Sequence, residues 1–329
     1  MTPLAIIGAG AWGTALAIAA RRAGSQVTLW ARDPDIAAVI NERHENSVYL
    51  PSVALDPAIS ATADLAAAVA VADIAVLAVP AQFLRSVLAE LTACLPPGMP
   101  LLLCAKGIET GTLKTMAELA AELCPTHPLA VLSGPSFAAE VARDLPTAVV
   151  IASRDPALAK RAGAALGSAR FRPYSSEDVI GVELGGAVKN VLAIACGIVD
   201  GLRLGDNARA ALITRGLAEM TRLGIAKGAR AETFAGLSGL GDLVLTCSGA
   251  QSRNHALGVA LGQGKSLKAA LGGRRSVVEG VASAASIAAL AGRLDVEMPI
   301  VGAVEAVLHR GMAIGPMIEG LLARPRRAE

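Results

Sequence analysis

Aromatic side chains are the scarcest feature of this 329-residue chain: Phe, Trp and Tyr make up 2% of it, while hydrophobic residues make up 53%. The core must therefore be aliphatic, which suits helices packed on a parallel sheet. Neither sign of charge dominates, because 30 basic residues against 28 acidic ones leave a formal charge of +2. A basic surface for nucleic acid needs a larger excess, so we expect no nucleic-acid partner.

Cysteine and histidine are also sparse. The five cysteines never stand in C-x-x-C spacing, and the four histidines lie far apart in the sequence. This pattern matches neither a disulfide framework nor a metal site, and it indicates a reducing compartment. We therefore expect no metal ion in the functional site.

Uninterrupted apolar runs of membrane-spanning length are missing as well. The longest candidate, residues 180–199, contains Glu183, Lys189 and Asn190, so it predicts a buried helix rather than a lipid-exposed span. The apolar N-terminal run is too short for a signal peptide and leads directly into glycines. We expect a cytoplasmic protein without integral membrane association.

What the chain does have is a glycine pattern at its start. Residues 4–7 predict an apolar strand, and residues 14–22 predict a helix. Between them stand Gly8, Gly10 and Gly13 in the spacing G-x-G-x-x-G, which in this context is typical of dinucleotide binding. The three glycines permit a tight turn, a close approach of backbone to a diphosphate, and close packing of helix on strand. The diphosphate is expected at the helix N-terminus.

The first half of the chain alternates strand and helix patterns. Its strands are near-continuous apolar runs, typical of strands buried on both faces of a parallel sheet; they are residues 4–7, 26–30, 73–79, 101–105, 130–132 and 148–151. After about residue 180, only helical patterns broken by glycine follow. The sequence predicts a doubly wound, Rossmann-like α/β domain with a parallel sheet over residues 1–180, and an all-helical substrate and catalytic domain over residues 181–329.

The end of the second strand bears on the choice of cofactor. Domains that prefer NAD carry an acidic residue there, whereas NADP-binding domains carry an arginine nearby. Here Trp30 and Ala31 are followed by Arg32, which is placed to meet a 2′-phosphate. Asp33 comes next, and its acidic side chain is also compatible with NAD, so the two residues together do not exclude either cofactor. We expect NADPH to be preferred and NADH to be accepted.

Polar residues follow several predicted strands at their carboxyl ends, where ligands bind on open α/β sheets. Lys106 follows one apolar strand, and residues 133–136 form a Ser-Gly-Pro-Ser turn after the next. The backbone N–H groups and hydroxyls of such a turn suit a substrate or an amide. The alternatives are a solvated loop lysine and plain turn chemistry.

Three clusters in the second half place polar groups inside apolar sequence. Lys189 follows two glycines in an apolar helical run, where desolvation would lower its pKa toward the range of a general acid or base. Asp242 forms the second cluster, and Ser252, Arg253 and Asn254 form the third. Arg and Asn at a helix start suit an anion. The plainer alternatives are a snorkelling lysine and a helix cap.

Together these motifs resemble the bacterial glycerol-3-phosphate dehydrogenases that use NAD or NADP. The resemblance runs in order through nearly the whole chain: it includes the glycine fingerprint and residues 106–107, 133–136, 183–190, 208–219, 239–246, 252–254 and 278–280. It implies reversible reduction of dihydroxyacetone phosphate to sn-glycerol 3-phosphate, a precursor of glycerophospholipids. It also implies a cytoplasmic homodimer.

The resemblance also assigns roles to single residues. It implies that Lys189 transfers the proton, that Asp242 holds this lysine, and that Lys106 belongs to the catalytic group. The implied substrate positions are Lys106, Gly134, Ser136, Lys189, Asp242, Ser252, Arg253 and Asn254. The implied cofactor positions are Gly8, Gly10, Ala11, Trp12, Gly13, Arg32, Lys106, Ala138, Arg253, Val277 and Glu279.

A mechanism follows from these roles. As hydride reaches the ketone carbon, negative charge develops on the oxygen, and a cationic Lys189 would stabilise that charge and deliver the proton. Arg253 and Asn254 would anchor the phosphate. One alternative is a β-hydroxyacid or ketopantoate-type dehydrogenase, which shares the plan and the lysine but acts on carboxylates. Another is a dinucleotide-binding redox sensor, in which we would expect Lys189 or Arg253 to be lost.

Overall fold

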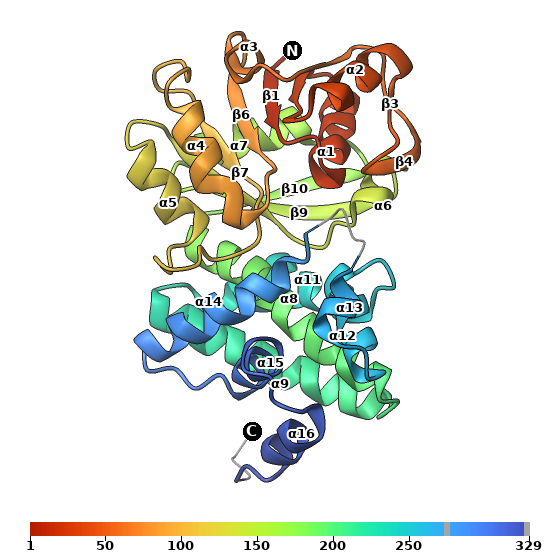
Figure 1. The fold of residues 1–329 in the computed structure, drawn as a ribbon. Coiled ribbons are helices and arrows are strands. Elements are labelled where there is room, and N and C mark those ends of the chain that lie inside the picture. The colour runs from red at the N-terminus through yellow and green to blue at the C-terminus, as the bar shows by residue number, and fades with distance from the viewer. Residues whose placement is uncertain (273–276, 326–329) are drawn as a thin grey trace.

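The computed structural model describes residues 1–272 and 277–325. The chain folds into two halves stacked end to end, an N-terminal half built on a sheet and a C-terminal half built of helices (Figure 1). The N-terminus and the last described residues lie at opposite ends of the molecule. The change from sheet to helices falls between residues 176 and 179.

An eight-stranded sheet forms the centre of the N-terminal half, in the order β10-β9-β8-β7-β6-β1-β2-β5. Its strands are β1 (Pro3–Ile7), β2 (Gln26–Trp30), β5 (Ile59–Thr62), β6 (Ile74–Leu77), β7 (Leu101–Leu103), β8 (Leu129–Ser133), β9 (Thr147–Ala152) and β10 (Phe171–Ser176). Neighbouring strands from β5 through to β8 all pair in parallel. This arrangement confirms the doubly wound α/β class.

The last two strands differ from the expected parallel sheet. β9 pairs antiparallel to β8, and β10 pairs parallel to β9. A parallel neighbour needs a connection that carries the chain back along the whole sheet, usually through a long helix. The connection from β8 to β9 holds only the short helix α6 (Ala138–Ala142), and β9 therefore starts at the edge where β8 ends. The apolar run predicted the strand but not its direction.

Several strands were not predicted at all. They are β5, β10 and the hairpin formed by β3 (Glu45–Asn46) and β4 (Leu50–Ala54). β5 alternates apolar with polar residues, and β10 carries Pro173 on the edge of the sheet, where a missing N–H is tolerated. None of these segments shows the continuous apolar run that marks a strand buried on both faces.

Alternate residues of β1 contribute to two separate cores. Leu4 and Ile6 face α1 (Ala11–Arg22), α2 (Pro34–Arg43) and α7 (Pro156–Leu166). Ala5 and Ile7 face α3 (Leu65–Val69), α4 (Leu84–Leu91) and α5 (Met116–Leu123). Because side chains alternate along a strand, a sheet covered on both faces needs apolar residues at every position. Each fully buried isoleucine contributes about 1.5–3 kcal/mol through the water-accessible area that it loses.

The helical half is organised around α8 (Val179–Gly201), whose residues 181–199 are all buried. Within the described ranges, α8 alone is long and apolar enough to span a membrane, but neighbouring parts of the protein enclose it, as expected for a core helix. The other elements are α9 (Asp206–Lys227), α10 (Ala231–Ala235), the π-helical turn η2 (Leu237–Gly241), α11 (Asp242–Ser248), α12 (Arg253–Gly262), α13 (Leu267–Leu271), α14 (Glu279–Arg293), α15 (Pro299–His309) and α16 (Ile314–Leu322).

α8 and α12 pack backbone against backbone. Gly197 on α8 meets Gly258 on α12, and Gly201 meets Gly262 one turn further along. A methyl group added at Gly197 would overlap the carbonyl oxygen of His255. Only glycine permits this approach, so the distance between the two helices is set by their main chains.

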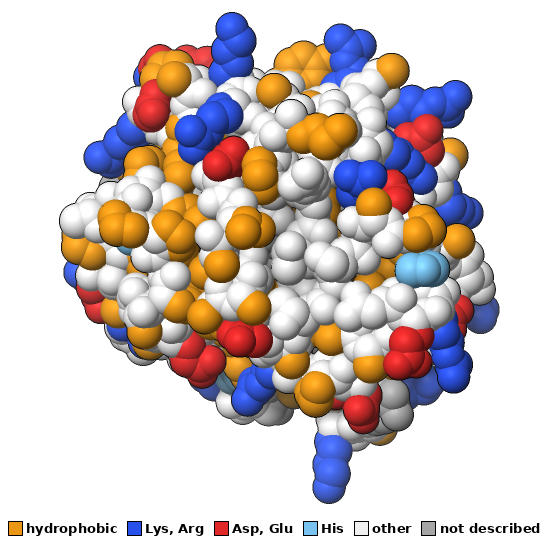
Figure 2. All heavy atoms as spheres, turned by 90° about the horizontal axis from the view of Figure 1, so that it is seen from above, with side chains coloured by type: hydrophobic (Ala, Val, Ile, Leu, Met, Phe, Trp, Pro, Cys, Tyr) orange, Lys and Arg blue, Asp and Glu red, His pale blue; other side chains and the backbone are white. Residues whose placement is uncertain are grey.

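The face of the N-terminal half that points away from the helices carries dispersed charges. Seen from above, its lysine and arginine side chains lie apart from one another, with acidic side chains among them (Figure 2). This dispersion agrees with the small net charge of the chain.

Candidate active site

The glycine turn follows β1 at its carboxyl end. β1 lies between β2 and β6, so the order of strands reverses at this point, and open α/β sheets bind ligands at such reversals. Gly8 has a φ of 118°, and a Cβ there would stand 2.9 Å from the carbonyl oxygen of Ala78. A Cβ at Gly13 would overlap the carbonyl oxygen of Gly8. Glycine is therefore required both for the turn at Gly8 and for the close packing of α1 against this turn at Gly13.

The region above Gly10 can receive a diphosphate. Apart from Gly10 itself and its two neighbours in the chain, no described atom lies within 4 Å of the place where a Cβ of Gly10 would stand. Gly10 is the N-cap of α1, and no side chain caps the helix there, so the first N–H groups of α1 are free for an anion. The indole N–H of Trp12, in the same helical turn, is buried and has no partner among the described residues. These features fit the dinucleotide that the glycine spacing predicts.

Arg32 and Asp33, which follow β2, differ in what they contact. Asp33 caps α2, and one of its carboxylate oxygens accepts a hydrogen bond from the Asp35 N–H at 3.0 Å. Arg32 is exposed and has no hydrogen bond or ion pair within the described part of the chain. The acidic residue is therefore engaged by its own helix, and the guanidinium is available to a ligand.

Two lysines meet at a single buried carboxylate in the helical half. Asp242 has no exposed surface; one of its oxygens accepts a hydrogen bond from Lys189 Nζ, and the other accepts one from Lys106 Nζ at 2.8 Å. Lys106 also donates to the carbonyl oxygen of Gly134 at 3.0 Å, and Lys189 donates to Thr246 Oγ1 at 3.0 Å. The cluster joins the carboxyl edge of the sheet to helices α8 and α11.

Lys189 is the more deeply buried of the two lysines, with 7% of the residue exposed. Its burial lowers the pKa of the Lys189 ammonium to about 8; the carboxylate of Asp242 acts in the opposite direction, and the charge of Lys106 lowers the pKa further. An amine that titrates near neutral pH is suited both to donate and to accept a proton. The apolar run around this lysine predicted such desolvation.

The two glycines before Lys189 let α8 approach its neighbours closely. A Cβ at Gly186 would stand 2.7 Å from Ser133 Oγ and 3.3 Å from Lys106 Cγ. A Cβ at Gly185 would overlap the carbonyl oxygen of Ser238 in η2. α8 thus touches the end of β8, the stem of Lys106 and η2 at once, and this contact brings the two lysines to one carboxylate.

The start of α12 presents one free and one engaged side chain. Ser252 caps the helix as predicted, because its hydroxyl oxygen accepts a first-turn N–H at 3.1 Å. Arg253 is exposed and forms no hydrogen bond or ion pair with any described residue. Asn254 is buried; it donates to Asn190 Oδ1 at 2.9 Å and accepts from the Gly280 N–H at 3.0 Å. Arg253 is available to an anion, whereas Asn254 ties α8, α12 and α14 together.

The other predicted positions lie around this cluster at the junction of the halves. Ser136 donates to the Gly134 carbonyl at 2.8 Å, beside Lys106. Glu279, at the start of α14, accepts a hydrogen bond from the Ala81 N–H at 3.1 Å, and burial raises the pKa of its carboxyl group. Ala138 is the first residue of α6, and Val277 is exposed two residues before α14.

Two residues of the cluster, Thr246 and Asn190, lie in the motifs around Asp242 and Lys189 but were given no role of their own. Thr246 lies one turn after Asp242 on α11, and its hydroxyl donates to the Asp242 carbonyl at 2.6 Å. This i,i+4 spacing places both residues on one helix face and was a usable signal in the sequence. Asn190 donates to the Lys106 carbonyl at 3.1 Å, but only its position next to Lys189 could have indicated this.

Both halves of the chain match models of one protein family. Residues 3–159 match the NAD-dependent glycerol-3-phosphate dehydrogenase N-terminus, and residues 178–319 match the C-terminus of the same family. A Rhodospirillum rubrum protein named glycerol-3-phosphate dehydrogenase (NAD(P)+) is 57% identical over 326 residues, which cover 99% of this chain and 93% of that protein. A Caulobacter vibrioides protein of the same name is also 57% identical, with 98% of each chain covered.

A solved structure has the same fold over its whole length. It is the glycerol-3-phosphate dehydrogenase of Coxiella burnetii, which is 41% identical, with a TM-score of 0.94 and coverage of 98% of this chain and 99% of that one. These matches favour neither the ketopantoate-type alternative nor the redox sensor. The two family models and the full-length relatives agree with the glycine turn and the buried lysine: the chain belongs to the NAD-dependent glycerol-3-phosphate dehydrogenase family.

Proposed function

We propose that this site interconverts dihydroxyacetone phosphate and sn-glycerol 3-phosphate and so feeds glycerophospholipid synthesis. The observation that carries the proposal is the buried group of Lys189, Asp242 and Lys106, which lies at the carboxyl edge of a sheet with a glycine turn. A bound nicotinamide dinucleotide supplies the hydride for the reduction and takes it back in the oxidation.

Lys189 is the proton donor for the ketone oxygen in the reduction and the acceptor in the reverse direction. Asp242 and Thr246 hold its Nζ in one place, so the charge is oriented before the substrate arrives. Burial makes the ammonium acidic enough to release its proton near neutral pH. Lys106 shares the carboxylate and adds a second positive charge beside the developing oxyanion.

The substrate phosphate is held at the start of α12. Arg253 is exposed there and forms no hydrogen bond or ion pair with any described residue, and it is the first residue of the helix, where N–H groups of the first turn can also bind an anion. Ser252 caps this turn, and Asn254 fixes it to α8 through Asn190. Gly134 and Ser136, beside Lys106, complete the substrate positions on the sheet side.

NADPH is the preferred cofactor, because Arg32 is free to meet a 2′-phosphate while Asp33 caps α2. The diphosphate is held by the glycine turn with Ala11 and Trp12, and Ala138, Val277 and Glu279 complete the cofactor positions with Lys106 and Arg253. The protein acts as a cytoplasmic homodimer. Its domains divide at residue 180, close to the start of α8.

The test is the absorbance of NADPH and NADH at a fixed protein concentration with dihydroxyacetone phosphate added. We expect the absorbance to fall with both cofactors, and faster with NADPH. Ketopantoate and pyruvate serve as carboxylate controls of similar size. Faster turnover of either carboxylate than of dihydroxyacetone phosphate would transfer the proposal to the hydroxyacid dehydrogenases.

A further inference from the structure

The β3–β4 hairpin, which the sequence patterns did not predict, lies against the glycine turn. Asn46 is the last residue of β3, and only 1% of it is exposed. A buried carboxamide is expensive unless its donors and acceptor are satisfied. The partners of Asn46 therefore indicate what this residue does.

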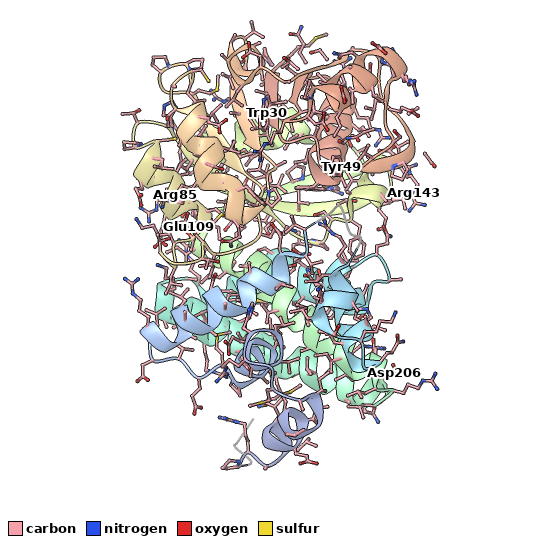
Figure 3. The ribbon with its side chains drawn as sticks, viewed as in Figure 1. Trp30, Tyr49, Arg85, Glu109, Arg143 and Asp206 are labelled. Atoms are coloured by element: carbon pink, nitrogen blue, oxygen red, sulfur yellow. The ribbon has the colours of Figure 1, made fainter. Side chains whose placement is uncertain are left out.

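The side chain of Asn46 makes three hydrogen bonds. Its Nδ2 donates to the carbonyl oxygen of Ala9 at 2.8 Å and to Thr14 Oγ1 at 2.8 Å. Its Oδ1 accepts the backbone N–H of Tyr49 at 3.3 Å, and Figure 3 marks Tyr49 beside α1. One carboxamide thus joins the glycine turn, the first turns of α1 and the bend of the hairpin.

The contact with Ala9 concerns the cofactor directly. Ala9 stands between Gly8 and Gly10, where a diphosphate needs N–H groups and is repelled by carbonyl oxygens. A buried carbonyl must have a donor, and Asn46 supplies that donor from the protein side. The bond keeps the Ala9 oxygen turned into the protein, away from the open space above Gly10.

We propose that Asn46 is a positioning residue for the dinucleotide, which holds the Ala9 carbonyl away from the diphosphate and ties the turn to α1. Asn46→Asp tests this with almost no change of shape. The aspartate cannot donate to Ala9 or Thr14, and it adds a negative charge behind the turn. Both effects oppose an anion at the same place.

Asn41 is a matched control on the neighbouring helix. Its side chain also bridges backbone groups: Nδ2 donates to the Ala61 carbonyl at 2.8 Å, and Oδ1 accepts the Ala61 N–H at 2.8 Å. These bonds tie α2 to β5, and none of them involves the glycine turn. Asn41 is an exposed residue whose two bonds to Ala61 are partly buried, so Asn41→Asp removes an amide donor of the same chemistry without acting on Ala9.

The experiment measures the dissociation constant of NADPH for the full chain by titration calorimetry, without substrate, together with the thermal midpoint of unfolding. We expect Asn46→Asp to raise this constant by about tenfold or more, because the Ala9 carbonyl loses its donor and a negative charge is added behind the turn. The KM for dihydroxyacetone phosphate at saturating NADPH should stay within about twofold, because a bound cofactor restores the site. Asn41→Asp should lower the thermal midpoint and leave the NADPH constant unchanged.

Two results would overturn the proposal: an NADPH constant that Asn46→Asp does not raise, or an equal rise from Asn41→Asp. If Asn46→Asp does not fold, Asn46→Ser is the variant that tests the proposal. The serine hydroxyl keeps a single donor, so this variant should raise the NADPH dissociation constant by an intermediate amount. The inference rests on the proposed site of the diphosphate, which Gly10→Val tests separately by filling the open space. If Gly10→Val leaves the constant unchanged, that site is wrong; if only Gly10→Val raises it, the role of Asn46 alone is wrong.

Discussion

The two halves of the molecule offer opposite kinds of binding surface. Around Gly10 the N-terminal half offers free backbone N–H groups and empty space. Around Asp242 the C-terminal half offers the buried charges of Asp242 and Lys189, already paired with each other and with Lys106 from the edge of the sheet. The first surface depends on small residues, and the second depends on the number and sign of its charges. Substitutions that alter size and substitutions that alter charge should therefore have separate effects.

Lys189→Met should give the largest difference between an effect on turnover and an effect on cofactor binding. It removes the charge of the side chain and keeps most of its volume. The kcat for reduction should fall by about a hundredfold to ten-thousandfold, the usual range for a positioned acid. The dissociation constant of NADPH should hardly change, because the glycine turn is untouched. Steady-state rates and calorimetry on the same preparation measure both. Near-normal turnover would assign the proton transfer to another group, with Lys106 as the next candidate.

Arg253→Ala tests the charge at the start of α12. We expect binding of dihydroxyacetone phosphate, and of inorganic phosphate as a competitor, to weaken by about 1.5–3 kcal/mol, the worth of one charge-assisted contact. Dihydroxyacetone itself should be affected much less, since it has no phosphate to lose. Equal impairment of both ketones would mean that Arg253 serves the fold or the cofactor instead.

The paired charges also predict a pH profile. In the proposed mechanism the reduction needs protonated Lys189, and burial lowers the pKa of this ammonium to about 8. The kcat/KM for reduction should therefore be level at lower pH and fall about tenfold per pH unit above that value. Oxidation should show the opposite dependence and rise until about the same pH. Asp242→Asn removes the charge that favours the ammonium, and should move the break to lower pH. A flat profile for the unaltered protein between pH 7 and 9.5 would exclude Lys189 as the titrating group.

The smallest effect is expected at the edge of the N-terminal surface. Arg32→Ala should raise the KM for NADPH by several-fold to about tenfold and leave that for NADH nearly unchanged, because an exposed ion pair with a 2′-phosphate is screened by solvent. The ratio of the two KM values is the measurement that decides. An equal change for both cofactors would show that Arg32 does not distinguish them.

Local patterns predicted much of the fold. The apolar runs predicted the central strands, and the glycine spacing predicted the turn after β1. Ser252 indicated where α12 begins. Each of these features depends only on residues that are close together in the sequence. The expectation that every strand of the sheet is parallel was wrong for the pairing of β9 with β8, since the direction of β9 depends on how far α6 carries the chain. The hairpin that carries Asn46 was missed because β3 has only two residues, both polar, and because Pro51 and Ser52 interrupt the apolar residues of β4.

Long-range pairings set the limit for the candidate site. Desolvation of Lys189 could be predicted from its own helix, whereas the contact of Lys106 with Asp242 joins residues 136 positions apart. No periodicity indicates such a pair. It follows from the packing of α8 against the end of β8 through Gly186, and this contact exists only in the folded chain.

The glycine contact between α8 and α12 has a consequence for substrate size. α8 carries Lys189, the proposed proton donor, and α12 begins with Arg253, the proposed phosphate anchor. The contact between the two main chains at Gly197 and Gly258 therefore fixes the distance between these two helices. Substitutions elsewhere can change the size of a pocket by one methylene group at a time. The distance between α8 and α12 cannot be changed in such small steps, because even a methyl group at Gly197 or Gly258 would overlap the backbone of the facing helix. Redesign toward longer phosphorylated ketones would have to rebuild the helix pair rather than trim the pocket wall.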